Sequence, residues 1–258
     1  MKFAEPRDIK SRESCSFYQS FDWPDGSVVD GTWDYRDDPE GCLGGVNFAG
    51  KSVLELGPAS GYLTMPMERL GADVVCIDTD PDYAWDVVPR RDDDSAAYAS
   101  QRAQDIHKLH DSWWATWNAF KLQARIAYIG ASRLREVEGE FDIGLIASIL
   151  QHFENPYVVM SEMARLCKTI VITEPVVPRL DNVHPMIEFA PNADNEILDS
   201  WYLMNAAAVE QMMRTLRFEK VDGSKTSYPL YHERRMPGGS QDAFLTYTFG
   251  SQVFTEIE

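Results

Sequence analysis

The sequence is poor in the features that mark secreted, membrane-bound and metal-dependent proteins. Its opening segment, MKFAEPRDIKSRESC, is charged and contains no apolar core of a secretory signal. No apolar run reaches the roughly 18 residues that a membrane span requires. The 4 cysteines lie far apart without a Cys-x-x-Cys pair, which argues against a zinc site and favours free thiols. We therefore expect a cytoplasmic protein with no membrane association and no bound metal.

Basic residues are also scarce. The chain contains 24 Lys and Arg residues against 41 Asp and Glu residues, for a formal net charge of −17. Its longest basic runs are the pairs Arg90-Arg91 and Arg234-Arg235. Proteins that bind nucleic acid gain affinity from Lys and Arg placed against phosphates. The composition therefore disfavours a nucleic-acid substrate and favours a small molecule, although it leaves room for a local basic pocket.

Residues 1–50 differ in character from the rest of the 258-residue chain. They are rich in Asp, Gly and aromatic residues and show neither helical nor alternating periodicity, and turn signals such as Pro24-Asp25-Gly26 divide them. Such a segment needs a core to pack against, so we predict a cap or lid on a following domain. The alternative is an irregular N-terminal extension whose aromatic residues serve only packing.

From residue 51 onward, short apolar runs alternate with helical patterns, which predicts an α/β domain with a parallel sheet over 51–258. The predicted strands are 52–56, 74–77, 126–129, 143–148 and 168–173, with a closing strand pair at 218–222 and 243–249. The predicted helices are 62–70, 157–166 and 204–216.

A polar insertion occupies about 80–125 of this domain. We interpret Asp92-Asp93-Asp94 as a solvated loop rather than a metal site, because consecutive side chains seldom converge on one ion. Trp113, Trp114 and Trp117 have helical spacing, and we expect them to be buried against the sheet edge or the cap rather than stacked on a ligand.

The strongest local motif follows the first of these strands. In VLELGPASG, Gly57 and Gly61 form a Gly-x-x-x-Gly turn at a strand end, where open α/β sheets bind ligands and where missing side chains allow close approach of the backbone. Asp78 ends the next strand, where a carboxylate can accept hydrogen bonds from both hydroxyls of a ribose. Together these features predict a nucleoside site.

The turn also limits which nucleoside cofactor can bind. A dinucleotide site would show Gly-x-Gly-x-x-Gly, but Ala59 stands at the second glycine position, and the carboxylate of Glu55 would repel a pyrophosphate. The same carboxylate would attract the amino group of a methionine moiety. The chain also lacks a Walker lysine. The spacing Glu-x-Gly-x-x-x-Gly resembles motif I of class I S-adenosylmethionine-dependent methyltransferases.

The resemblance extends over residues 17–218. The matching blocks are FYQSFDWPDGSVVDGTWD, GKSVLELGPASGYLTMPMERLGADVVCIDTD, EFDIGLIASILQHFENP and DSWYLMNAAAVEQMMRTLRF, which are similar to the branch of tRNA wobble-uridine (carboxy)methyltransferases and their small-molecule relatives. This resemblance implies a Rossmann-like sheet of order 3-2-1-4-5-7-6 with helices on both faces. It also implies S-adenosyl-L-methionine as cofactor and S-adenosyl-L-homocysteine as product. Whether the cofactor carries an extra carboxyl group, as in part of that branch, is left open.

The resemblance further implies a set of site residues. Those expected to contact the cofactor are Trp33, Glu55, Gly57, Ser60, Gly61, Tyr62, Asp78, Thr79, Ala131, Ser132, Ser148 and Ile149. Gln151 and Tyr202 are expected to contact the substrate. Two departures stand out: many methyltransferases have Asp where this chain has Ala131-Ser132, and the wobble-uridine enzymes have Tyr at the position of Gln151.

His152 is the candidate general base, because imidazole titrates near neutral pH and this residue is expected at the edge of the transfer site. The alternative role is to cap the helix that follows Asn155-Pro156. Arg235 is a weaker candidate, with His184, His232 and Arg234, for binding a carboxylate or phosphate on the substrate.

The sequence thus predicts methyl transfer from S-adenosylmethionine to an O or N atom of a small-molecule acceptor. The alternatives are a tRNA-modifying (carboxy)methyltransferase, a non-catalytic S-adenosylmethionine-binding protein and, against the turn spacing, a nicotinamide-dependent dehydrogenase. The oligomeric state is not specified, and we allow for a homodimer.

Overall fold

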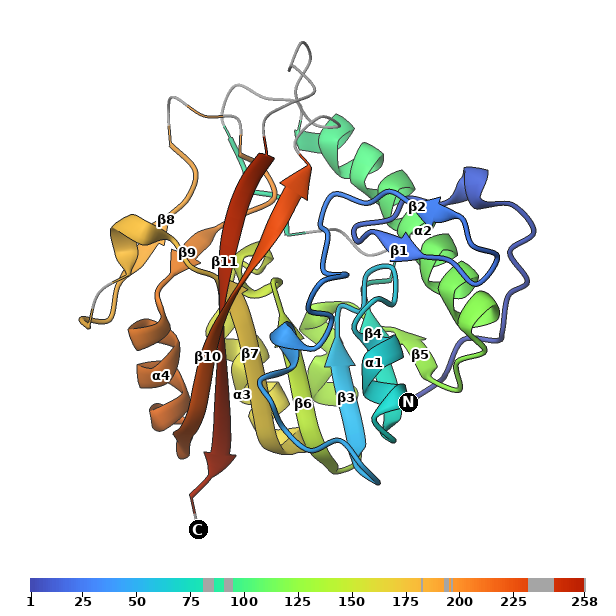
Figure 1. Ribbon diagram of the computed structural model, residues 1–258. Helices are drawn as coiled ribbons and strands as arrows, with labels where there is room; N and C mark the ends of the chain where they lie inside the picture. The colour runs from blue at the N-terminus through green and yellow to red at the C-terminus, as the bar shows by residue number, and fades with distance from the viewer. Residues whose placement is uncertain are drawn as a thin grey trace.

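A seven-stranded sheet forms the centre of the computed structural model (Figure 1), which describes residues 1–80, 86–90, 95–181, 183–192, 195, 197–231 and 244–257. Five parallel strands make up most of it: β3 (Ser52–Leu56), β4 (Asp73–Asp78), β5 (Arg125–Tyr128), β6 (Phe141–Ala147) and β7 (Cys167–Pro175). Two antiparallel strands, β10 (Phe218–Tyr231) and β11 (Phe244–Glu256), complete one edge. The spatial order β10-β11-β7-β6-β3-β4-β5 is the predicted order 3-2-1-4-5-7-6 read from the other edge, so the predicted fold class is confirmed.

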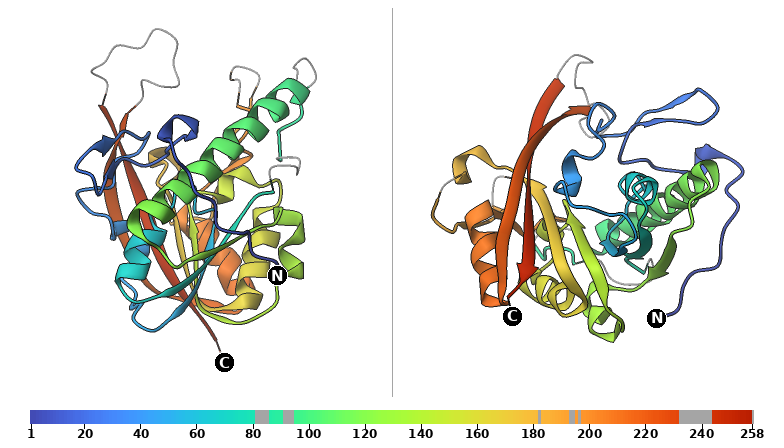
Figure 2. Two further views of the ribbon diagram at one scale, coloured as in Figure 1. Left: turned by 90° about the vertical axis from the view of Figure 1, so that its right-hand side faces the viewer. Right: turned by 60° about the horizontal axis from the view of Figure 1, so that its bottom comes forward.

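Helices cover both faces of this sheet. Helices α1 (Thr64–Arg69) and α2 (Ser95–Phe120) lie on one face, and α3 (Pro156–Leu166) and α4 (Ala206–Thr215) lie on the other (Figure 2). Successive side chains of a strand point to opposite faces, so a strand covered on both sides must be apolar at nearly every position. In β3, Val53 is buried in the core beneath α1 and α2, while Leu54 is buried in the core beneath α3 and α4.

The N-terminal segment packs on the face that carries α1 and α2. It contains a short hairpin, β1 (Phe21–Asp22) with β2 (Val28–Val29), and two short 3₁₀ helices, η1 (Arg12–Ser14) and η2 (Gly41–Leu43). The ring of Phe21 is 1% exposed and lies 5.0 Å, centroid to centroid, from the ring of Tyr62. Phe21 therefore serves packing, while the predicted division of the chain at residue 50 and the predicted lid role of the segment stay predictions.

The insertion forms the long helix α2 on the same face. Trp113 and Trp114 are buried in the core, which confirms the packing role predicted for them. The indole nitrogen of Trp114 donates a hydrogen bond of 2.9 Å to the hydroxyl of Tyr128, which anchors the helix to the end of β5. Asp92-Asp93-Asp94 lies outside the described residues.

The remaining strands, β8 (Ile187–Phe189) and β9 (Tyr202–Met204), form a separate two-stranded sheet near the carboxyl ends of the parallel strands. All four cysteines are free thiols. In the part of the chain that the structure describes, no helix combines the length and apolar character needed to cross a membrane. The cytoplasmic location and the homodimer stay predictions.

Candidate functional site

The carboxyl ends of β3, β4 and β6 meet at one edge of the sheet. Leu56, the last residue of β3, pairs with Ile77 on one side and with Ile146 on the other, so the residues that follow these strands lie side by side. A cavity of about 1060 Å³ opens at this edge. Open α/β sheets bind ligands at this position, where successive strands connect to opposite faces.

The turn after β3 brings backbone against the cavity. Gly57 has a φ of 69°, and a Cβ added there would lie 2.3 Å from Cδ1 of Ile149. Two non-glycine residues that line the cavity, Ala59 and Ser148, also have positive φ values, of 50° and 52°. Such conformations cost energy and concentrate at functional sites. The turn is thus built for close contact between backbone and a ligand.

Gly61 has a different task from Gly57. It has a φ of 80°, and a Cβ added there would lie 3.2 Å from Cδ1 of Trp113 and 3.5 Å from Cγ2 of Thr116, both on α2. Gly61 therefore allows α2 to pack closely against the start of α1, and it does not line the cavity. Its predicted contact with a cofactor stays a prediction.

Asp78 ends β4 and is one of the residues that line the cavity. Its Oδ1 accepts a 2.7 Å hydrogen bond from the backbone N–H of Thr79, whereas its buried Oδ2 has no hydrogen-bond partner among the described residues. Burial raises the pKa of this carboxyl to about 7. Buried polar atoms in folded proteins are nearly always paired. An unpaired acceptor beside a glycine turn therefore indicates a missing ligand donor, as the hydroxyls of a ribose would supply.

His110 on α2 lies behind Asp78. Its Nε2 is 3.8 Å from Oδ2 of Asp78, too far for a hydrogen bond, and is also without a partner among the residues described. The imidazole stacks on the ring of Tyr128 at 4.1 Å between centroids. Burial, with smaller contributions from His107 and Arg7, lowers its pKa to about 3. His110 is therefore neutral and does not neutralise Asp78.

Glu55 is the second buried carboxylate that lines the cavity. Its Oε2 accepts hydrogen bonds from the hydroxyl of Thr64 at 2.6 Å and from the thiol of Cys76 at 3.3 Å. Burial raises its pKa to about 7, an effect that these two hydrogen bonds oppose. The side chain is thus held in place inside the strand, with its charge close to the turn.

His152 closes the other side of the cavity from η4 (Leu150–His152). Its Nδ1 is hydrogen-bonded to the backbone carbonyl of Asp199. A carbonyl can only accept, so Nδ1 carries the proton and, in the neutral ring, Nε2 holds the lone pair. The side-chain amide of Gln151 lies 3.4 Å from this Nε2. The alternative role as a helix cap falls to Asn155, whose side chain accepts from the backbone N–H of Val158 at 3.3 Å.

Glu174 lies at the carboxyl end of β7 and also lines the cavity. Its Oε1 accepts hydrogen bonds from the backbone N–H groups of Ile149 and Leu150, at 3.1 and 3.0 Å. Burial raises its pKa to about 7. Glu174 thus lines the cavity, and its hydrogen-bond partners are backbone N–H groups rather than an arginine.

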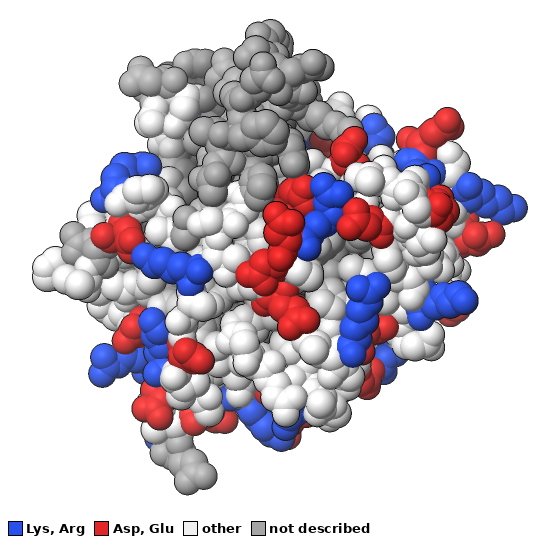
Figure 3. All heavy atoms as spheres, viewed as in Figure 1, with Lys and Arg blue, Asp and Glu red and all other residues white. Residues whose placement is uncertain are grey.

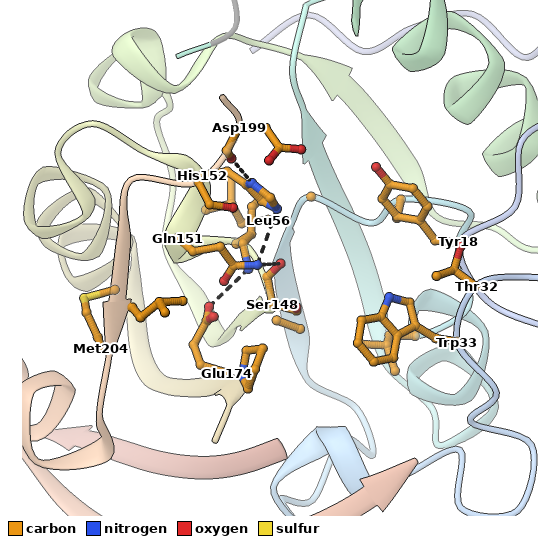
Figure 4. A pocket seen from close by; sticks show the side chains of 18 of the residues that line it. Tyr18, Thr32, Trp33, Leu56, Ser148, Gln151, His152, Glu174, Asp199 and Met204 are labelled. Carbon is orange, nitrogen blue, oxygen red and sulfur yellow. Dashed lines mark hydrogen bonds between the residues drawn. The ribbon is translucent and has the colours of Figure 1, made fainter. Parts of the chain in front are cut away.

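The N-terminal segment supplies the opposite wall. Figure 4 shows Tyr18, Thr32 and Trp33 across the cavity from Ser148, Gln151, His152 and Glu174. The hydroxyl of Ser60, within the glycine turn, donates a hydrogen bond to the side chain of Gln19, which joins this wall to the turn. The sequence identified Trp33 but gave no signal for Tyr18 or Gln19, because the segment has no periodicity.

A narrower apolar slot adjoins the cavity between β4 and β6. Ile129, Ile149 and Phe153 line it together with Asp78 and Thr79. Flat apolar walls beside a carboxylate suit a planar base whose attached sugar reaches that carboxylate. Ile129 directly follows β5, and the nearby Ala131 and Ser132 were predicted to contact the cofactor.

The structure brings most of the predicted site residues together. Those that line the cavity are Trp33, Glu55, Gly57, Asp78, Thr79, Ser148, Ile149, Gln151, His152 and Tyr202. Ser60, Gly61 and Tyr62 are not among the residues that line the cavity. Ala131 and Ser132 begin η3 (Ala131–Glu136) after β5, with side chains that the structure does not describe, and Arg235 lies outside the described residues. Arg102 of α2 lines the cavity and was not predicted.

Comparison with known proteins agrees with this geometry. Residues 54–170 match the family model described as a methyltransferase domain. This match and the sheet order confirm the predicted resemblance to class I S-adenosylmethionine-dependent methyltransferases. The likeness to the wobble-uridine branch stays a prediction. No curated protein matches the sequence.

Solved structures share the fold at low sequence identity. A protein of Bacillus halodurans C-125 described as a methyltransferase is 11% identical, with a TM-score of 0.55 over 86% of this chain and 100% of that one. The N-terminal domain of EvdMO1, crystallised with S-adenosylhomocysteine and D-fucose, is 12% identical, with a TM-score of 0.53 over 96% and 94%. At these identities the likeness shows the fold alone.

Proposed function

We propose that this chain is an S-adenosylmethionine-dependent methyltransferase that acts on an O or N atom of a small-molecule acceptor. The observation that carries the proposal is the unpartnered, buried Oδ2 of Asp78 at the cavity edge, beside the glycine turn at Gly57. The solved structure of EvdMO1 holds S-adenosylhomocysteine, the product of such a reaction, in a protein of the same fold.

The cavity residues fit the three parts of this cofactor. Asp78 would accept hydrogen bonds from the ribose, Glu55 would attract the amino group of the methionine part, and the apolar slot at Ile129 and Ile149 would hold the adenine. Thr79, Ser148 and Trp33 line the same space. Five further residues are proposed to lie near the cofactor and to shape the turns around it: Ser60, Gly61, Tyr62, Ala131 and Ser132. When bound, S-adenosylmethionine supplies a methyl group on a positively charged sulfur.

His152 is the proposed base. Its Nδ1 proton is held by a backbone carbonyl, so its Nε2 is the atom that can take a proton from an acceptor hydroxyl or ammonium. Gln151 and Tyr202 line the cavity near it and would position the acceptor. Residues 1–50 would act as the lid that keeps water from the site, since they build the wall at Tyr18 and Trp33.

Charge supports a small molecule over RNA as the acceptor. On the face drawn in Figure 3, basic side chains of the described residues are scattered among acidic ones instead of forming a stripe. The described Lys and Arg residues that line the cavity have partners: Arg179 pairs with Glu188, Lys225 pairs with Asp181 at 2.8 Å, and Arg102 is hydrogen-bonded to Tyr18. Phosphate-backbone binding depends on available Lys and Arg, so this arrangement favours a compact acceptor.

The test supplies radiolabelled S-adenosylmethionine to the purified protein with either a metabolite extract or bulk tRNA. We expect label in the small-molecule fraction, and much less with the His152→Gln variant. Label in tRNA would support the RNA-modifying alternative. Tight binding of S-adenosylhomocysteine without label in either fraction would support a non-catalytic sensor, and preferential binding of NADH would support a dehydrogenase.

A further inference from the structure

Glu174 has an oxygen that the fold does not use. Both backbone N–H groups that reach its carboxylate, those of Ile149 and Leu150, donate to Oε1. Among the described residues nothing donates to Oε2. Figure 4 shows the carboxylate beside Ser148 and Gln151, on the wall that carries His152. Because Oε1 holds the side chain in place, Oε2 is a fixed, available hydrogen-bond acceptor in the cavity.

The part of the cavity beyond Glu174 is mostly apolar. Its lining residues there are Pro175, Val176, Val177, Pro178, Leu203 and Met204. The basic residues in this region are paired, since Arg179 donates from Nε to Glu188 at 3.2 Å and Lys225 donates to Asp181 at 2.8 Å. An available carboxylate oxygen among apolar walls and paired cations favours a hydrogen-bond donor or a cation and disfavours an anion.

We propose that Glu174 binds the methyl acceptor directly, and that the acceptor is a molecule with an apolar body and an amine or hydroxyl group. This inference rests on the proposed function and names the class of substrate that it leaves open. Glu174 and His152 would divide the work: Glu174 holds the donor group of the acceptor, and Nε2 of His152 takes the proton that methylation displaces. The raised pKa of Glu174 agrees with a carboxylate set in apolar surroundings that a bound cation would stabilise in its charged form.

The substitution Glu174→Gln tests this role without removing the structural one. The amide oxygen of glutamine can still accept from the N–H groups of Ile149 and Leu150, while an NH₂ donor replaces Oε2. The binding of S-adenosylhomocysteine should therefore persist. Glu219→Gln is the matched control, because it makes the same chemical change on β10 at an exposed position that does not line the cavity.

The experiment measures binding of three probes that share one ring, 2-phenylethylamine, 2-phenylethanol and phenylacetate, to the full-length protein saturated with S-adenosylhomocysteine. Ligand-observed NMR gives the three dissociation constants. We expect the amine to bind most tightly and the dissociation constant of phenylacetate to be at least about tenfold higher. The ammonium group can make a charge-assisted hydrogen bond to Glu174, and the carboxylate of phenylacetate cannot. Glu174→Gln should abolish this preference, and Glu219→Gln should keep it.

Several results would overturn the inference. These are equal binding of the three probes, binding by none of them, preference for phenylacetate, or an amine preference that survives in Glu174→Gln. Preference for phenylacetate would instead support the anion-binding role predicted for Arg235. If the wild-type protein does not bind S-adenosylhomocysteine, the proposed function fails and this inference fails with it. If that product binds but the probe pattern is absent, only the role of Glu174 fails.

Discussion

Replacing Asp78 with asparagine should have opposite effects on ligand binding and on stability. The asparagine oxygen can still accept the backbone N–H of Thr79, which is 2.7 Å from Oδ1 in the wild type. Its NH₂ group would take the place of Oδ2, which is buried and has no partner among the described residues. That group would face Nε2 of His110, 3.8 Å from the present Oδ2. The variant therefore keeps the shape of the site and removes its charge.

The expected loss of affinity follows from the hydrogen bonds of a ribose. A hydrogen bond to a charged group contributes about 1.5–3 kcal/mol, so loss of one such bond should raise the dissociation constant of S-adenosylhomocysteine about 10- to 150-fold. Calorimetric titration at pH 8 measures this change. Asp73→Asn, at the exposed first position of the same strand, is the matched control and should bind like the wild type. Wild-type affinity in Asp78→Asn would refute the role of Asp78.

The stability of the ligand-free protein should change in the other direction. Burial raises the pKa of Asp78 to about 7, so at pH 8 the wild type holds an ionised, unpaired carboxylate in its core. A carboxyl with a raised pKa in the folded state stabilises that state at low pH, and this contribution is lost as the pH rises through about 7. Asp78→Asn should therefore melt at a higher temperature than the wild type at pH 8, and the difference should shrink at pH 6. A variant that melts lower at both pH values would contradict this reasoning.

Three further substitutions test other parts of the site. His152→Gln should lower kcat, measured by steady-state kinetics, about 10²- to 10⁴-fold. Its affinity for S-adenosylhomocysteine, measured by calorimetry, should stay within about twofold of the wild-type value. An unchanged kcat would exclude the base role. Gly57→Ala places a Cβ 2.3 Å from Cδ1 of Ile149 at a φ of 69°. It should lower the free energy of unfolding by about 1–2 kcal/mol in urea titrations and should weaken binding of S-adenosylhomocysteine. Wild-type stability and binding would show that the turn is not constrained. Phe21→Ala removes a ring that is 1% exposed. The same titrations should show that the free energy of unfolding falls by about 3–5 kcal/mol. A fall of less than about 1 kcal/mol would show that residues 17–48 are not integral to the fold.

The parallel part of the sheet was predictable because each strand leaves a strong local pattern. Ser52–Leu56 was predicted at both ends, since a polar residue precedes this buried apolar run and Gly57-Pro58 ends it. The strand pair at the far edge was predicted too short. In the structure β10 continues to Tyr231 and β11 continues to Glu256. Much of β10 is exposed, so its polar residues have no apolar period to detect.

The candidate site was predictable where one motif held the residues together, as at Gly57 and Asp78. His110 was missed because its approach to Asp78 arises only when α2 folds across the sheet, and no spacing in the sequence encodes that contact. Tyr18 and Gln19 were missed for the same reason, since they reach the cavity from an irregular segment. Site residues within one local motif could be predicted from the sequence. Contacts made by the insertion and by the N-terminal segment depend on tertiary packing and could not.

The central claim is that the cavity edge at β3 and β4 holds S-adenosylmethionine through its ribose and its amino-acid end. A crystal structure of the protein grown with S-adenosylhomocysteine tests it most directly. We predict density for one nucleoside in the cavity, with a ribose hydroxyl within hydrogen-bond distance of Oδ2 of Asp78 and the adenine between Ile129 and Ile149. A nucleoside bound elsewhere, or no density at millimolar ligand, would contradict the account.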